Sequence, residues 1–117
     1  MAVLDTILIQ EILNTSTTVN SDYVSDSIDI SFREAEFSIN MDYSNGVNVD
    51  MDFQIEVSND NVTFVPITDS IHTVTDASGT SIFDIGGTGT NYLRVGIVVR
   101  SGSIDVQKII YKAKRRH

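Results

Sequence analysis

The chain of 117 residues contains no cysteine and no tryptophan, and it has only one proline and two histidines. Without cysteine, a disulfide framework, a thiolate metal site and a cysteine nucleophile are all excluded. His72 and His117 are too far apart in the sequence to show zinc-ligand spacing. His72 falls at an alternating strand position and is expected to be an ordinary surface residue. These absences remove most metal-dependent and nucleophilic enzymes from consideration.

Basic residues are also scarce, with eight Lys and Arg against sixteen Asp and Glu, for a net charge of −8. The few basic residues are concentrated at the end of the chain, where the last ten residues include Lys108, Lys112, Lys114, Arg115 and Arg116. An acidic body argues against nucleic acid as the main partner, because phosphate contacts need a basic face. The basic end is expected to be solvated or to dock on an acidic protein neighbour, including a second copy.

Two stretches invite other functions and are better explained structurally. The opening segment VLDTILIQEIL carries two acids and no basic lead, so neither a signal peptide nor a membrane span is expected. The glycine cluster IGGTGTN lacks the Lys-Ser/Thr ending of a phosphate loop and precedes a strand pattern instead of a helix.

Paired acids could serve a glycosidase, but no aromatic platform for a sugar is evident. Tyr92 and Tyr111 are expected to pack in strands. No enzyme is expected.

Clustered oxygen-bearing side chains raise the question of calcium. Asp50 and Asp52 flank Met51, and residues 58–61 read Ser-Asn-Asp-Asn. These segments lack the ligand order of an EF-hand loop. Asn and Asp are also common turn residues, because their side chains accept hydrogen bonds from nearby backbone amides. The turn interpretation is favoured, a structural calcium site stays open, and no cofactor is expected.

Alternation with a period of two dominates the sequence and predicts strands. In VNVDMDFQIEV, residues 47–57, apolar side chains fall on one face and polar ones on the other. The preceding AEFSINM places Phe37, Ile39 and Met41 on one face. Between these strands, Asn45-Gly46 is the dipeptide that favours a tight type I′ turn. The sequence therefore predicts a hairpin at residues 45–46.

A second hairpin is predicted near the end of the chain. YLRVGIVV, residues 92–99, resembles a central strand buried on both sides, and SIDVQKIIYKAK, residues 103–114, would return antiparallel to it after a turn at 100–103. TILIQEIL suits a strand better than a helix and would lead into a long polar loop. Pro66 cannot donate to a ladder, which predicts an edge strand there. Five shorter strands are predicted at residues 6–13, 27–32, 63–67, 70–75 and 81–85.

Together these patterns predict an all-β protein of about eight strands, arranged as a single antiparallel β-sandwich of the jelly-roll or immunoglobulin-like type. The sandwich would span residues 1–117 as one domain. It would have an N-terminal strand or arm at 1–20 and a short basic C-terminal tail at 112–117.

Three segments in order carry a resemblance to a known group. They are FQIEVSNDNVTFVPI, then SIFDIGGTGTNYLRVGIVVRSGS, then a closing strand that ends in Lys and Arg. Across residues 24–113 the chain resembles the small β-sandwich virion proteins of tailed bacteriophages, which include capsid decoration or cement proteins, head fibres, and collar or tail accessory proteins. It departs from that pattern with Asn61 where Gly is frequent and with Phe64 where Trp is common.

The resemblance implies a non-enzymatic virion structural protein, foremost a capsid decoration, cement or head-accessory protein that acts through protein–protein contacts. Its partners would be other virion proteins, namely the major capsid protein or neck and tail components, and further copies of itself. No membrane role is expected, and nucleic acid is disfavoured as a partner. A carbohydrate- or receptor-binding module of a phage tail, collar or fibre is the alternative. The residues expected to hold a partner are Lys112, Lys114, Arg115 and Arg116.

Overall fold

The computed structural model describes residues 5–30, 36–86 and 90–116. Apart from one short 3₁₀ turn, η1 at Thr68–Ser70, the regular elements in these ranges are all strands. No helix among the described residues has the length and apolar character needed to cross a membrane. The strands are β1 (Asp5–Leu13), β2 (Thr17–Val19), β3 (Tyr23–Val24), β4 (Ile28–Asp29), β5 (Glu36–Ser58), β6 (Val65–Pro66), β7 (His72–Val74), β8 (Gly79–Gly86) and β9 (Tyr92–Arg116).

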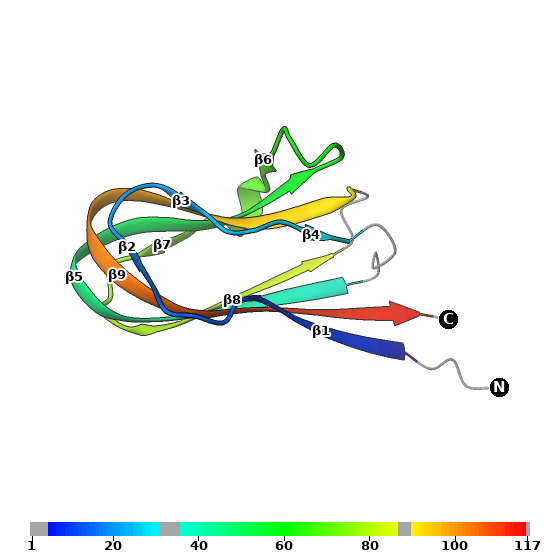
Figure 1. Ribbon diagram of the computed structural model, residues 1–117, viewed down its shortest axis with the longest axis horizontal. Coiled ribbons are helices and arrows are strands. Elements are labelled where there is room, and N and C mark those ends of the chain that lie inside the picture. Colours follow the sequence, from blue (N-terminus) through cyan, green and yellow to red (C-terminus); the bar gives the residue numbers. More distant parts are fainter. Residues whose placement is uncertain (1–4, 31–35, 87–89, 117) are drawn as a thin grey trace.

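Two long strands, β5 and β9, organise the molecule. They pair antiparallel along their whole length, from Glu36 opposite Lys114 to Ser58 opposite Tyr92. This two-stranded ribbon folds over on itself midway, as the tight bend at one end of the molecule shows (Figure 1). Each long strand therefore contributes its two halves to two different layers, which lie one above the other.

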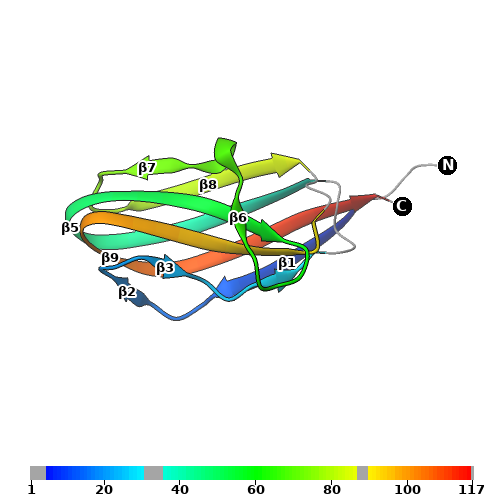
Figure 2. The ribbon, with the colours of Figure 1, turned by 90° about the horizontal axis from the view of Figure 1, so that it is seen from above.

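The first sheet contains β1 and β2, the C-terminal half of β9, the N-terminal half of β5, and β8, in that order. The second contains the short strands β3 and β4, the N-terminal half of β9, the C-terminal half of β5, and then β7 and β6. Figure 2 shows β7 and β8 following one side of this arrangement. A long antiparallel ribbon rolled into two sheets in this order is a jelly roll. The β-sandwich prediction is confirmed, and the strand order excludes the immunoglobulin-like alternative.

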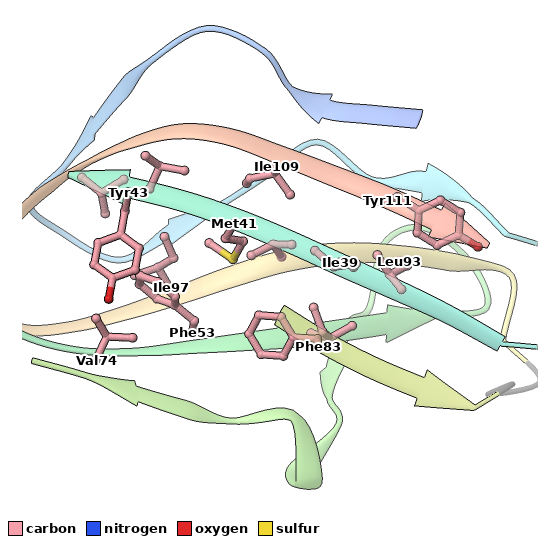
Figure 3. Packing of buried hydrophobic residues seen from close by; sticks show 14 of the residues in the cluster. Ile39, Met41, Tyr43, Phe53, Val74, Phe83, Leu93, Ile97, Ile109 and Tyr111 are labelled. Atoms are coloured by element: carbon pink, nitrogen blue, oxygen red, sulfur yellow. The ribbon is translucent and has the colours of Figure 1, made fainter. Parts of the chain in front are cut away.

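The core lies between the two sheets and follows the predicted alternation. Ile39 and Met41 of the first sheet face Phe53 of the second (Figure 3), and Phe37 and Ile55 are buried in the same cluster. Aromatic rings pack together at both ends of the core, with Tyr43 edge-on to Phe53 at 5.4 Å and Phe37 against Tyr111 at 5.6 Å between ring centres. The other wholly buried side chains include Met51, Leu93, Val95, Ile97, Ile104, Val106, Ile109 and Tyr111.

Both predicted hairpin turns are wrong, because each lies inside a continuous strand. Asn45-Gly46 is within β5, and Gly102 is within β9. These residues form the corner at which the ribbon passes from one sheet to the other. Asn45, Asn48 and Gly102 have positive φ angles of 56°, 50° and 81°, and the β5–β9 register shifts between Ser44 and Asp50. A left-handed residue can bend a strand through a bulge as well as reverse it.

The two ends of the chain also differ from expectation. The strand predicted at residues 6–13 is confirmed as β1, but part of the polar stretch after it pairs with β9 as β2. Residues 112–116, expected as a tail, have their backbone in β9, where Thr6 lies opposite Arg115 and Ile7 opposite Lys114. His117 lies outside the described residues. Residues 112–116 continue the strand because their backbone groups can form hydrogen bonds with those of β1.

Two strand predictions concern the second sheet. β6, which contains Pro66, pairs with β5 at one end of the strand order, which confirms the edge position. The segment 92–99 was expected to be buried on both sides, and this is only half correct. Leu93, Val95 and Ile97 are buried in the core, whereas Val98 on the opposite face is partly exposed.

Candidate interaction surface

The outer face of the second sheet holds the main cluster of charged side chains that the structure brings together. It is formed by the residues of β5 and β9 that alternate with the core residues. We call it the charged face. Its members from the two long strands are Asp50, Asp52, Gln54, Glu56, Arg94, Gly96, Val98 and Arg100.

At the centre of the charged face, Glu56 and Arg94 form an ion pair. The pairing of β5 with β9 places these residues directly opposite each other, and Arg94 Nε donates to Glu56 Oε1 at 2.7 Å. Gln54 Nε2 donates to the other carboxylate oxygen, also at 2.7 Å. Glu56 is 8% exposed, so the carboxylate is buried with both oxygens hydrogen-bonded. The pair is therefore a fixed part of the sheet.

The guanidinium of Arg94 also holds the loop that follows β5. Its carbon lies 4.0 Å from the centre of the Phe64 ring, a cation–π distance. Phe64 is half-buried, so the aromatic that was noted in the sequence packs outward on Arg94 instead of entering the core. Arg94 therefore covers one face of the Phe64 ring.

A shallow hollow lies beside this pair, and Gly96 packs against the same carboxylate. A Cβ at Gly96 would collide with Glu56 Oε2, so glycine is required for the carboxylate to lie flat on the sheet. The hollow measures about 220 Å³ and is walled by Tyr23, Val24, Glu56 and Val98 among others. Pockets for small ligands usually measure about 300–1,000 Å³. The hollow is therefore too small for a typical small-molecule site.

Near the corner, Arg100 bridges the two aspartates that were considered for calcium. Its guanidinium donates to Asp50 Oδ1 at 2.8 Å and to Asp52 Oδ2 at 2.7 Å. Thr73 of β7 donates to Asp52 as well. The hydrogen bond from Arg100 is the main cause that holds the pKa of Asp52 below its ordinary value. A single guanidinium therefore binds both carboxylates and offsets part of their negative charge.

The loop between β5 and β6 uses its oxygens to satisfy its own backbone. Ser58 Oγ accepts hydrogen bonds from the amides of Asp60 and Asn61 at 3.2 and 3.0 Å. Asp60 Oδ1 accepts from the amides of Val62 and Thr63 at 2.9 and 2.8 Å. These two backbone donors, Thr63 first, lower the pKa of Asp60 to about 2. The turn interpretation is confirmed. Within the described ranges, no three His, Asp or Glu side chains are grouped as metal ligands.

His72 is the first residue of β7, and it contacts the neighbouring edge strand β8. Its ring stacks on Phe83 with 4.1 Å between ring centres and 12° between planes. The side chain is half-buried, so the predicted surface residue in fact helps to close the core. A hollow of about 260 Å³ adjoins it and is lined by Asp69, His72 and Asp84 among others.

The four basic residues predicted to bind a partner are placed only in part. Lys112 is exposed on the outer face of the first sheet, where it pairs across to Ile9 and Ser38. For Lys114, Arg115 and Arg116 the structure describes the backbone, and their side chains lie outside the described residues. The assignment of these residues to a partner stays a prediction.

The buried pair of Glu56 and Arg94 was not foreseen. In the sequence, Glu56 occupies a polar position of an alternating strand, and such positions normally face solvent. The signal that identifies the pair is the β5–β9 register, which places Arg94 opposite Glu56, and no pattern within either strand alone contains it.

No protein-family model matches the sequence, and no curated protein sequence is significantly similar to it. Solved structures do share the fold. The SPBc2 prophage-derived protein YomS matches with a TM-score of 0.56 and 11% identity over 95% of both chains. VP2 of infectious bursal disease virus matches with a TM-score of 0.63 and 9% identity, over 95% of this chain and 32% of VP2.

A third similar structure is the enzymatically active domain of tailspike protein 4 of bacteriophage CBA120. It matches with a TM-score of 0.59 and 12% identity, over 92% of this chain and 19% of that one. This chain thus spans about a third of VP2 and a fifth of the tailspike domain, whereas it matches YomS over nearly its full length. The shared feature is a β-sandwich that also occurs in a prophage-derived protein, a viral capsid protein and a phage tail protein.

Proposed function

We propose that this protein is a non-enzymatic bacteriophage virion protein that decorates the capsid, or serves as a head accessory, through protein–protein contacts. The observation that carries the proposal is the full-length match to a prophage-derived protein, in which the sandwich is nearly the entire chain. The occurrence of the same fold in the VP2 subviral particle supports it. Further copies of this chain and the major capsid protein are the proposed partners.

The described surface supports a role in contacts between proteins. On the charged face, Glu56 is paired with Arg94, and Arg100 is paired with two aspartates. Two hollows measure about 220 and 260 Å³, below the lower limit for small-molecule pockets, and a third measures about 330 Å³, just above it. Sheet faces with hollows of this size suit docking on another protein better than enclosing a substrate.

The proposal is tested on purified phage particles. Mass spectrometry should detect the protein at a fixed ratio to the major capsid protein, and antibody labelling in electron microscopy should place it on the head. Absence from washed particles would exclude a virion role, and labelling confined to the tail would exclude capsid decoration.

The predicted basic partner site needs a test that spares the fold. Deleting the end of the chain would remove backbone that pairs with β1, so substitution is preferable. A variant with Lys112, Lys114, Arg115 and Arg116 all changed to Gln should bind more weakly than the parent protein to capsids that lack this protein. Its melting temperature should stay the same. Equal occupancy by the variant and the parent protein would remove these residues from the interface.

The tailspike match supports a second candidate, a carbohydrate- or receptor-binding module of a phage tail, collar or fibre. A glycan array and a host-cell binding assay with the isolated protein separate the two candidates. Saturable, competable binding to a glycan or to cells favours the second candidate, and its absence together with capsid binding favours the first.

A further inference from the structure

β8 is a long and regular edge strand. Among the described residues it pairs with β5 alone. The pairing is continuous from Glu36 opposite Gly86 to Tyr43 opposite Gly79, with no shift in register. On the side away from β5, backbone N–H and C=O groups of β8 point outward from the edge of the sheet. A row of such groups can pair with another β-strand.

The other edges carry more features that discourage pairing than β8 does. β6 contains Pro66 and is two residues long, β7 is three residues long, and β2 to β4 are two or three residues each. β1 is longer, but its register is interrupted between Glu11 and Leu13. β8 reads GTSIFDIG, without proline, lysine, arginine or a bulge. Proteins usually blunt edges with short strands, proline, charge or bulges, and of these β8 has only the single charge of Asp84, so it is the least protected of the described edges.

At the middle of β8, Ile82 points away from the core. Its side chain is 54% exposed on the outer face of the first sheet, while its neighbour Phe83 is buried. Polar residues flank it on the same face, Thr80 before it and Asp84 after it. An apolar residue between a hydroxyl and a carboxylate is a short pattern that can pair with itself when reversed.

We propose that β8 pairs antiparallel with β8 of a second copy of this chain, about a two-fold axis at Ile82. In this register Ile82 lies opposite Ile82 of the second copy, and Asp84 lies opposite Thr80 at both ends. The aliphatic pair buries exposed surface, and each carboxylate lies opposite a neutral side chain instead of a second carboxylate. The single hydroxyl proton of Thr80 is donated to Asp42 Oδ1 of β5 at 2.7 Å, so the Ile82 pair supplies the main side-chain contact between the two copies.

The side chains favour the pairing centred on Ile82 over pairings centred on the adjacent residues of β8. A pairing centred on Phe83 sets Ile82 against Asp84, and one centred on Ser81 sets Ile82 against Thr80, so both lose the aliphatic pair. A pairing centred on Asp84 places two carboxylates opposite each other, which is destabilising. The two first sheets then become one continuous sheet through an isologous contact, the commonest arrangement in soluble dimers.

The inference stands independently of the virion role. A dimer that is absent from particles would refute the proposed function alone, and a monomer found on capsids would refute the pairing alone. The experiments below use the purified full-length chain.

The first experiment uses the absence of native cysteine. Ile82→Cys places one thiol per chain at the two-fold axis, and mild oxidation should convert most of the protein to a disulfide-linked dimer. Val62→Cys, at a side chain that is 80% exposed in the β5–β6 loop, is the matched control and should stay largely uncrosslinked. Ile9→Cys places a thiol on β1 and tests whether two copies pair through that edge strand instead of β8. Equal crosslinking at positions 82 and 62, or stronger crosslinking at position 9, would overturn the proposal.

The second experiment measures mass without a crosslink. Sedimentation equilibrium of the parent protein should give twice the chain mass of 12.9 kDa. Ile82→Lys sets two ammonium groups opposite each other and should give the single-chain mass with an unchanged circular dichroism spectrum, because this side chain is outside the core. Val62→Lys, the same change on the loop, should remain dimeric. A monomeric parent, or a dimeric Ile82→Lys, would refute the pairing.

Discussion

Asn45-Gly46 and the segment Ser58–Asn61 look alike in the sequence, and they do opposite things in the structure. Both are short polar breaks between alternating apolar runs, and both contain an asparagine with positive φ, 56° at Asn45 and 61° at Asn61. At residues 58–61 the chain reverses, and β6 returns along β5. At 45–46 it bends and continues in the same strand.

The difference lies in what the flanking residues pair with. On both sides of Asn45 the chain pairs with one partner, β9, which bends at the same place through Gly102. After Ser58 the chain pairs with the strand that it has just left. A left-handed residue permits a change of direction, and the available hydrogen-bonding partner decides whether that change is a corner or a hairpin.

The two regions are also held differently. The loop is held by its own side chains, because Ser58 and Asp60 accept hydrogen bonds from four backbone amides. The corner is held by close approach of the two bent strands, and a Cβ at Gly102 would overlap the carbonyl oxygens of Val47 and Asn48. Asn45 and Thr18 also donate to Asp105, with Thr18 as the main cause that lowers the pKa of that carboxyl.

The largest expected effect comes from adding a methyl group at the corner. Gly102→Ala combines a positive φ with overlap against backbone atoms of β5, so we expect a loss of about 3 kcal/mol in the free energy of unfolding. Urea titration measures it. Gly86→Ala is the control, since nothing lies within 4 Å of its Cβ, and the change there should stay within about 1 kcal/mol. Similar stability of both variants would show that the corner does not depend on close approach.

Ser58→Ala tests whether the loop depends on its own side chains. The hydroxyl is buried and bonds two amides, so its loss should cost about 1–2 kcal/mol in the free energy of unfolding. Ser101→Ala is the matched change at the corner, where the exposed hydroxyl donates only to the carbonyl of Asn48. It should cost about 0.5 kcal/mol or less. A larger loss from Ser101→Ala than from Ser58→Ala in the same urea titration would reverse the comparison.

Asp60 predicts a specific dependence of stability on pH. Its pKa is lowered from 3.8 to about 2 in the folded state, so the ionised form stabilises the fold. That contribution is complete above pH 3.8 and is lost as the pH falls toward 2. The difference in urea midpoint between the parent and Asp60→Asn should therefore shrink over this window. A difference that is constant between pH 6 and pH 2 would contradict the assignment.

The smallest effect is expected for Arg100→Gln. Its two ion pairs with Asp50 and Asp52 are on the surface and partly exposed, so the melting temperature should fall by less than for Ser58→Ala. The difference from the parent should decrease further in 1 M salt, where exposed charges are screened. A loss as large as that of Gly102→Ala would mean that charge pairing, and not backbone geometry, holds the corner.

Local pattern predicted much of the fold. Alternation placed Phe37, Ile39 and Met41 on the buried face, and Pro66 identified an edge strand. These predictions hold because burial on one face and the missing amide of proline are properties of neighbouring residues. The ion pair of Glu56 with Arg94 could not be predicted, since the two residues are brought together only by the register of β5 on β9.

The sequence by itself determined that the chain is an antiparallel β-sandwich with a turn at Ser58–Asn61, because period-two alternation and side-chain capping act within a few residues. Only the tertiary structure decided that Asn45-Gly46 and Gly102 form one shared corner, and that the sandwich is a jelly roll. An Asn-Gly pair or a single glycine allows either a hairpin or a bend within one strand. The bend forms here because the partner strand satisfies the backbone hydrogen bonds on both sides of it.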